Sequence, residues 1–242
     1  MKIRLLASLL ILTSVLTGQS AVVFNHSGNA NPTTEGWSEI GAGIGVTTGP
    51  VTNDLGTGLD SWFVRDTSVV TNSAIQYVAT PSPTIHVQAA TLGWTLSANV
   101  RMVESSVGSF GGMFADYLTD TVAFTMFFDR EPDGDPRVLL YGHGSYTLDG
   151  VGDGAYHLFE LVYDPTEGSA DLFVDGVERL SNYTGLASGD NRIGWGASGS
   201  TETGRGHFNS VSFTVVPEPS HTAWVGILVG ATMVSRRRRV LS

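Results

Sequence analysis

The densest group of chemically active side chains lies in the stretch FFDREPDGDPRVLL, which places four carboxylates within seven residues. Such a density is unfavourable unless water or a hard cation such as calcium screens the repulsion. The order D-x-E-x-D-G-D begins like an EF-hand loop, but position 12 is Leu140, where that loop needs a bidentate glutamate. The alternative is a solvated hairpin tip between strands at residues 122–128 and 137–141. The candidate calcium ligands are Asp129, Glu131, Asp133 and Asp135.

A second group of residues has the types that sugar-binding sites use. Such sites stack exposed aromatic rings on sugar faces and read the hydroxyl groups with Asp, Asn and backbone groups. In the alternative interpretation Trp195 packs in the core, and the glycines around it only form a long loop. The candidate ligand-binding residues are Tyr183, Asp190, Asn191 and Trp195.

No catalytic constellation is recognisable. The chain has no cysteine and no G-x-S-x-G motif, so an activated nucleophile is not indicated. Its six histidines form neither an H-x-x-x-H nor an H-x-H ligand pair. His157 falls in a predicted strand among apolar residues, where we expect a structural histidine. The sequence therefore predicts a protein that is not an enzyme and needs no catalytic cofactor.

The charge of the chain excludes nucleic acid as a partner. The formal net charge is −10, and residues 21–216 contain 7 arginines, no lysine and 22 acidic residues. A nucleic-acid-binding surface needs clustered cations to displace phosphate counterions. Cations and neutral glycans are better candidates. Because the chain has no cysteine, the fold must be stabilised by an ordinary hydrophobic core.

The pattern of residues 21–216 is that of an all-β domain with no helix of ten or more residues. In GWTLSANVRMVES every second residue from Trp94 to Met102 is apolar, which predicts one buried and one wet face. In YHLFELVYDPTEGSADLFVDGV two turns, DPTEGS and VDGV, join successive antiparallel strands. Further strands are predicted at residues 61–65, 75–79, 85–89, 122–128, 137–141, 192–195 and 208–215. More than eight strands with hairpin-length links predict a two-sheet antiparallel β-sandwich.

These strands resemble the concanavalin A-like lectin/glucanase superfamily, in particular LamG-like jelly rolls of exported bacterial proteins. The resemblance rests on YHLFELVYDPTEGSADLFVDGV and on the glycine-rich NRIGWGASGSTETGRGHFNSVSF, and covers most of residues 22–215. It implies a jelly roll, carbohydrate binding and frequent calcium. The E-x-D-x-x-E pattern that glucanases of this superfamily use is absent. A glycan-active hydrolase is therefore the alternative to a non-catalytic binding or structural module.

Both ends of the chain have the features of targeting segments. Residues 1–21 combine Lys2 and Arg4 with an apolar run and small residues, as in a secretory signal peptide read by the Sec machinery. Residues 222–235 are apolar and about 21 Å long as a helix, a marginal single transmembrane segment. The arginines that follow would keep that end in the cytoplasm. Those arginines are Arg236, Arg237, Arg238 and Arg239.

The tail at residues 216–242 resembles a PEP-CTERM sorting signal, in which a short motif, an apolar segment and a basic end follow in that order. The resemblance implies recognition and cleavage by an exosortase; the alternative is a C-terminal anchor that is never cut. We therefore expect an exported protein, transiently anchored in the membrane and sorted to the cell envelope, the outer surface or the extracellular matrix, with polysaccharide as a candidate partner. The motif residues are Val216, Pro217, Glu218 and Pro219.

Overall fold

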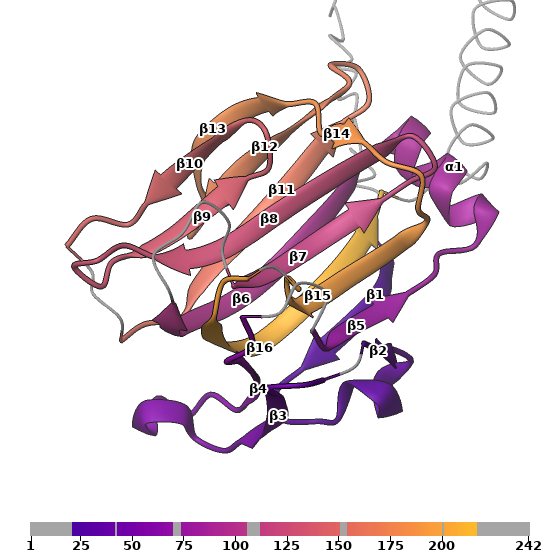
Figure 1. Cartoon of the computed structure of the whole chain (residues 1–242). Coiled ribbons are helices and arrows are strands. Elements are labelled where there is room, and N and C mark those ends of the chain that lie inside the picture. The colour runs from indigo at the N-terminus through magenta and orange to yellow at the C-terminus, as the bar shows by residue number, and fades with distance from the viewer. Residues whose placement is uncertain are drawn as a thin grey trace, which may run out of the picture. The chain divides into compact units, whose positions relative to one another are not determined.

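The protein folds into two antiparallel β-sheets that pack against each other (Figure 1). The computed structural model describes residues 21–41, 43–69, 74–105, 112–150, 154–199 and 201–216. The elements are β1 (Ala21–Ser27), η1 (Pro32–Glu35), β2 (Ser38–Ile40), β3 (Val46–Val51), η2 (Asp54–Gly56), β4 (Ser61–Asp66), β5 (Gln76–Ala79), α1 (Pro83–Leu92), β6 (Trp94–Ser105), β7 (Met113–Leu118), β8 (Val122–Arg130), β9 (Pro136–Leu140), β10 (Gly144–Thr147), β11 (His157–Asp164), β12 (Ser169–Val174), β13 (Val177–Tyr183), β14 (Leu186–Ala187), β15 (Arg192–Ala197) and β16 (Gly204–Val215).

Each sheet has eight strands within the part of the chain that the structure describes. Sheet A runs in the order β13-β12-β11-β6-β16-β4-β3, and β1 also pairs with β16. Sheet B runs in the order β10-β9-β8-β7-β15-β5-β2, and β14 pairs with β8. Every pairing is antiparallel. The predicted all-β, two-sheet sandwich is confirmed.

Strand β6 shows the predicted alternation, with one exception. Its wet face holds Thr95, Ser97 and Asn99, which are partly exposed, but Arg101 on the same face is buried under other elements. The residues that point into the sandwich are all buried: Trp94, Leu96, Ala98, Val100 and Met102.

The turn between β12 and β13 also follows the prediction. Asp175 and Gly176 both have positive φ, 51° and 75°, as a two-residue hairpin turn of the I′ type requires. The Asp175 carboxylate accepts a bond from the backbone N–H of Leu158 at 2.9 Å and contacts Nδ1 of His157 at 2.7 Å. His157 therefore holds this turn against β11, which agrees with the structural role expected for it.

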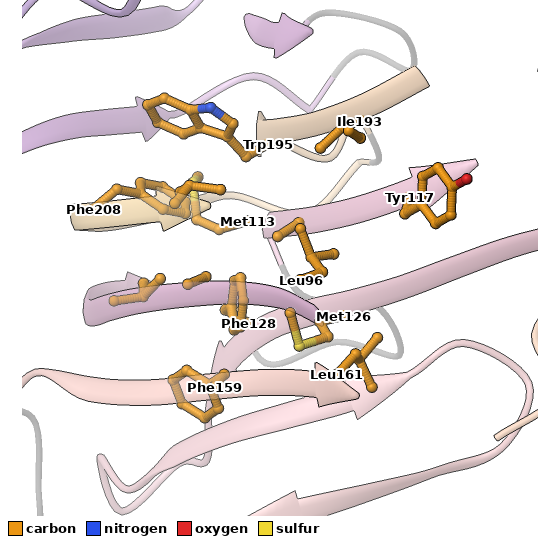
Figure 2. Close-up of a cluster of buried hydrophobic side chains, with 14 of the residues drawn as sticks. Leu96, Met113, Tyr117, Met126, Phe128, Phe159, Leu161, Ile193, Trp195 and Phe208 are labelled. Carbon is orange, nitrogen blue, oxygen red and sulfur yellow. The ribbon is translucent and has the colours of Figure 1, made fainter. Parts of the chain in front are cut away.

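The core lies between the two sheets and is rich in aromatic rings and methionine (Figure 2). Sheet A contributes Leu96, Phe159 and Phe208, and sheet B contributes Met126 and Trp195; each is at most 1% exposed. Fully burying a side chain of this size contributes about 1.5–3 kcal/mol. Since the chain has no cysteine, this core and the two hydrogen-bonded ladders stabilise the fold.

One predicted strand is wrong, because residues 85–89 lie within the ten-residue helix α1. The helix begins after Ser82, whose hydroxyl accepts a bond from the N–H of Ile85 at 3.4 Å, and Pro83 occupies its first turn. It ends at Gly93, whose φ is 95°. The β-branched residues of the segment favoured a strand, but the cap and the proline start a helix instead.

Both ends of the described chain leave the same end of sheet A. Ala21 of β1 lies opposite Val215 of β16, and Val215 also lies opposite Trp94 of β6. The backbone N–H of Val216 donates to the carbonyl of Gly93 at 3.2 Å. Within the described ranges no helix is long and apolar enough to cross a membrane. The predicted signal peptide before Ala21 and the apolar segment at residues 222–235 lie outside those ranges.

Candidate functional site

The two aromatic side chains predicted to stack on a ligand are both buried. Trp195 is 0% exposed and packs between His26 and Tyr77, each with its ring centroid 4.7 Å away. Tyr183 is 1% exposed, and its hydroxyl accepts a bond from the N–H of Thr125 at 3.2 Å. Neither ring has a free face, so the alternative interpretation, in which Trp195 packs in the core, is the observed one. The reason is that β15 is a central strand on which Ile193, Trp195 and Ala197 alternate inward.

The two polar residues predicted beside them lie at the surface, before β15. The amide of Asn191 donates to the carboxylate of Asp120, and Asp190 lies 3.5 Å from Nε of Arg192. Arg192 also pairs with Asp116 at 3.3 Å. Asp116 is 4% exposed, and burial raises its pKa to about 7 in spite of the arginine. The structure thus places Asp190 and Asn191 at the surface, whereas Tyr183 and Trp195 lie in the core.

The four predicted calcium ligands do not converge on one point. They lie in the hairpin of β8 and β9, in which Asp129 is opposite Arg137. Arg137 pairs with both Asp129 and Glu131, and the hydroxyl of Ser105 also donates to Asp129. Asp133 accepts a bond from the N–H of Asp135, and Asp135 accepts one from Gly150. Among the described residues no three acidic or histidine side chains are grouped so that they could hold a metal ion. The observed arrangement is the hairpin, because Arg137 and backbone N–H groups balance the carboxylates.

Of the predicted sorting residues only Val216 lies within the described ranges. It is 43% exposed and directly follows the last residue of β16. Pro217, Glu218 and Pro219, together with Arg236, Arg237, Arg238 and Arg239, lie outside those ranges.

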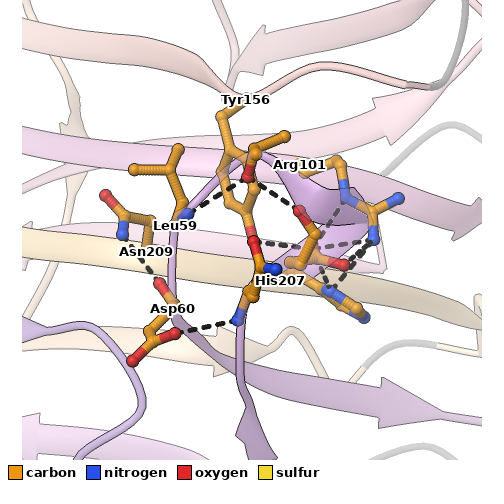
Figure 3. Close-up of polar contacts among 9 residues, drawn as sticks. Leu59, Asp60, Arg101, Tyr156, His207 and Asn209 are labelled. Carbon is orange, nitrogen blue, oxygen red and sulfur yellow. Dashed lines mark hydrogen bonds and ion pairs between the residues drawn. The ribbon is translucent and has the colours of Figure 1, made fainter.

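A buried polar network, which the sequence did not predict, joins Asp54 of η2 to both β6 and β16. Figure 3 shows its members Arg101, Tyr156 and His207. The Asp54 carboxylate accepts bonds from Nε and Nη2 of Arg101 at 2.8–2.9 Å and from the hydroxyl of Tyr156 at 2.8 Å. Nδ1 of His207 lies 2.7 Å from the same carboxylate. Asp54, Arg101 and His207 are each at most 6% exposed.

The electrostatics of this network favour one charge state. Burial alone would raise the pKa of Asp54, but the bonds from Tyr156, Arg101 and His207 hold it below its usual value. Burial lowers the pKa of His207 and raises that of Tyr156 to about 12. A neutral His207 then donates from Nδ1 to the ionised Asp54. Arg101, Tyr156 and His207 already occupy both oxygens of Asp54, so we assign the network a structural role.

An aromatic recess opens at the end of the sandwich where β6 begins. It has a volume of about 170 Å³, and its walls include Trp94, Tyr117, Phe124 and Tyr163. Trp94 and Tyr163 are stacked, with centroids 5.4 Å apart and an interplanar angle of 4°. Nδ1 of His86 in α1 lies 2.9 Å from the hydroxyl of Tyr117, which ties the helix to this wall.

Three threonines form the polar rim of the aromatic recess: Thr119, Thr121 and Thr184. Thr119 lies in the turn between β7 and β8, where its hydroxyl bonds both backbone groups of Val122. Thr121 and Thr184 are exposed. Trp94, Tyr117 and Phe124 are each at most 5% exposed, so the partly exposed Tyr163 is the ring of this wall that a sugar face could contact. Among the residues that the structure describes, no carboxylate lines the recess.

One family model matches part of the chain. Residues 145–219 match the lectin insertion of the Vibrio cholerae sialidase. This segment begins in β10 and includes β11 to β16, hence half of sheet A and the strand that carries Trp195. No curated protein matches the chain.

Solved structures to which the chain is similar include a carbohydrate esterase from the Shiga toxin-encoding bacteriophage phi24B. It has a TM-score of 0.57 and 13% identity, over 82% of this chain and 100% of that chain. Domain 4 of the arabinanase AbnA from Geobacillus stearothermophilus, in complex with arabinotriose, has a TM-score of 0.48 and 12% identity, over 81% and 93%. A botulinum neurotoxin type C structure has a TM-score of 0.49 and 11% identity, over 87% of this chain and 51% of that chain. At these identities the likeness to the esterase structure shows a jelly-roll β-sandwich fold and nothing finer.

Proposed function

We propose that this protein is an exported, non-catalytic carbohydrate-binding module of the cell surface or extracellular matrix. The observation that supports this function is the aromatic recess, with Trp94 and Tyr163 in its wall and threonine hydroxyls at its rim. Its volume of about 170 Å³ suits one sugar ring rather than an extended drug-sized ligand. The match of residues 145–219 to a sialidase lectin insertion is consistent with this proposal.

The test is a screen of the purified protein on an array of bacterial and plant polysaccharides, followed by calorimetry on the positives. Tyr163→Ala removes a partly exposed ring from the recess. We expect it to weaken binding about tenfold, or about 1.4 kcal/mol, since an aromatic contact contributes on that scale.

Tyr141→Ala is the matched control. Tyr141 is 40% exposed and lies outside the recess, between β9 and β10. It should leave binding unchanged. A protein that binds no glycan on the array, or two variants that weaken binding equally, would show that the recess is not a sugar site. Turnover of any polysaccharide above background would instead favour the rival function, a glycan-active hydrolase.

The proposed route to the surface uses both ends of the chain. The Sec machinery exports the protein, and the apolar segment at residues 222–235 anchors it briefly in the membrane. An exosortase then recognises Pro217, Glu218 and Pro219 and removes the tail. Intact-mass spectrometry of the native protein tests this: the product should begin near Ala21 and end close to residue 217–219. A native protein that retains Met1 and Ser242 would rule this route out.

A further inference from the structure

Charged residues are missing from the segments at which the described chain begins and ends. Residues 21–216 carry 7 arginines and 22 acidic residues, yet none of these lies in residues 21–34, 67–100 or 206–216. Those three segments include β1, α1, the first half of β6 and most of β16. The net negative charge of the domain is therefore carried by the rest of its surface.

The uncharged segments meet at one end of sheet A. Ala21 of β1 lies opposite Val215 of β16. The N–H of Val216 donates to the carbonyl of Gly93, the residue that follows α1. Helix α1 also packs against β16, and its Ala89 is 0% exposed. The exposed residues of β1 and α1, together with Val216, are here called the terminal face.

The terminal face presents apolar side chains to solvent. Val22 of β1 is 61% exposed, Val87 of α1 is 63% exposed, and Val216 is 43% exposed. The other exposed positions of α1 are proline, threonine and alanine. A single exposed valine needs no explanation, but these three lie beside both ends of the described chain on a surface without charge. The terminal face therefore has the composition of a contact surface.

Carboxylates border the terminal face but do not belong to it. Glu160 and Asp164 lie on β11, which β6 and β16 separate from β1 in sheet A. Asp164 accepts a bond from the N–H of Thr166 within its own turn at 2.7 Å. Beyond β1, Glu35 contacts Nδ1 of the buried His26 at 2.6 Å. The charge around the terminal face is negative, and the face itself is neutral.

We propose that the terminal face rests on the surface of a phospholipid bilayer while the tail anchors the protein. The contact rests on the proposed function, because the anchor brings the bilayer to this end of the domain. Six steps along the chain separate Val216 from the start of the apolar segment at residues 222–235. Six extended residues span at most about 21 Å, so the membrane lies within that distance of Val216.

Charge decides which side of the domain faces the lipid. The surface potential of anionic phospholipids repels carboxylates, so an acidic domain is repelled in most orientations. The terminal face presents no carboxylate, and its valines lose contact with water when they touch the interface. Since α1 has no lysine or arginine, attraction to phosphate does not hold it there. The short tether keeps the face at a high local concentration beside the bilayer, so a weak contact is sufficient.

Single cysteines test this contact, because the chain has none of its own. Val22→Cys and Val87→Cys place a nitrobenzoxadiazole label on the terminal face. Val177→Cys is the matched control, because Val177 is 50% exposed and lies on β13, four strands from β16 in sheet A. The full chain is reconstituted in vesicles of phosphatidylcholine and phosphatidylglycerol that contain nitroxide-labelled headgroups. Emission at positions 22 and 87 should fall at least about twofold relative to the control.

The outcomes separate the lipid contact from the proposed anchoring. A protein that floats with the vesicles while all three labels keep their emission would overturn the contact and leave the anchoring intact. A protein that does not float would overturn both. Shielding of the labels at positions 22 and 87 from iodide in detergent solution without vesicles, rising with protein concentration, would assign the face to a second copy of the chain and overturn the lipid contact.

A charge placed on the terminal face gives an independent test. Val87→Asp should reduce the quenching of a label at position 22 at least about twofold, because the new carboxylate is repelled by the anionic surface. Val177→Asp adds the same charge far from the terminal face and should leave that quenching unchanged. Equal effects of the two substitutions would show that net charge, and not this face, determines the contact.

Discussion

The buried network around Asp54 leads to a prediction whose magnitude follows from its contacts. Asp54→Asn keeps the shape of the side chain but removes the negative charge that faces Arg101, whose side chain is 7% exposed. Leaving one partner of a buried ion pair uncompensated costs about 3–5 kcal/mol. For a domain of about 200 residues, each kcal/mol lowers Tm by about 2–4 °C. We therefore expect Tm to fall by about 6–20 °C.

Two further variants separate the charge from the hydrogen bonds. Tyr156→Phe removes one bond of 2.8 Å to the same carboxylate and should cost about 1–2 kcal/mol. Asp54→Leu combined with Arg101→Met removes both charges and should be less destabilising than Asp54→Asn alone. The assay is guanidinium unfolding with thermal melts of all three proteins. If Asp54→Asn costs no more than Tyr156→Phe, the pair is not desolvated and the reasoning is refuted.

Three more predictions concern single sites. Burial raises the pKa of Asp116 from 3.8 to about 7, so the folded state binds the proton of this carboxyl group more tightly than the unfolded state does. The stability of the wild-type protein therefore falls as pH rises from about 4 to 7. The stability of Asp116→Asn relative to wild type should therefore rise by up to about 1.4 kcal/mol per pH unit from about 4 to 7; a flat difference in urea melts would contradict the shift. Leu55 is 62% exposed and has a φ of 54°, a left-handed conformation that asparagine adopts more readily than leucine. Leu55→Asn should therefore stabilise the protein by up to about 1 kcal/mol in the same melts, and a loss of stability would show that the backbone at Leu55 is not strained. Ser82→Ala should destabilise it by about 1 kcal/mol through loss of the helix cap, whereas an unchanged Tm would mean that the cap contributes nothing.

The strands could be predicted because their pattern is local. From Trp94 to Met102 apolar and polar residues alternate without interruption. In the VDGV turn, Gly176 indicates a tight hairpin, because glycine readily adopts positive φ. The helix at residues 83–92 was missed, although Ser82 followed by Pro83 is a start signal for a helix. Trp195 was a candidate ligand-binding residue, with packing in the core as the alternative, and the structure shows it in the core. The alternation of Ile193, Trp195 and Ala197 was the signal that pointed inward.

The candidate sites could not be predicted in the same way, because their residues meet through pairings distant in sequence. Asp54 and His207 are 153 residues apart. In the aromatic recess, Trp94 belongs to sheet A and Tyr117 to sheet B, and they meet only because the sheets pack face to face. Asp66 lies opposite Gly204, which comes 138 positions later in the chain. Local periodicity shows which face a side chain takes, not which strand lies next to it.

The strand that leads into the tail is one of the best-held strands of the domain. Strand β16 has twelve residues and pairs with β6 along its length, with β4 over its first half and with β1 over its second half. Under the proposed anchoring, tension at Val216 acts along β16, so the hydrogen bonds to β1 and β6 are loaded in parallel rather than one by one. Because Val215 lies opposite Trp94, the aromatic recess is at the end of the sandwich at which β16 ends.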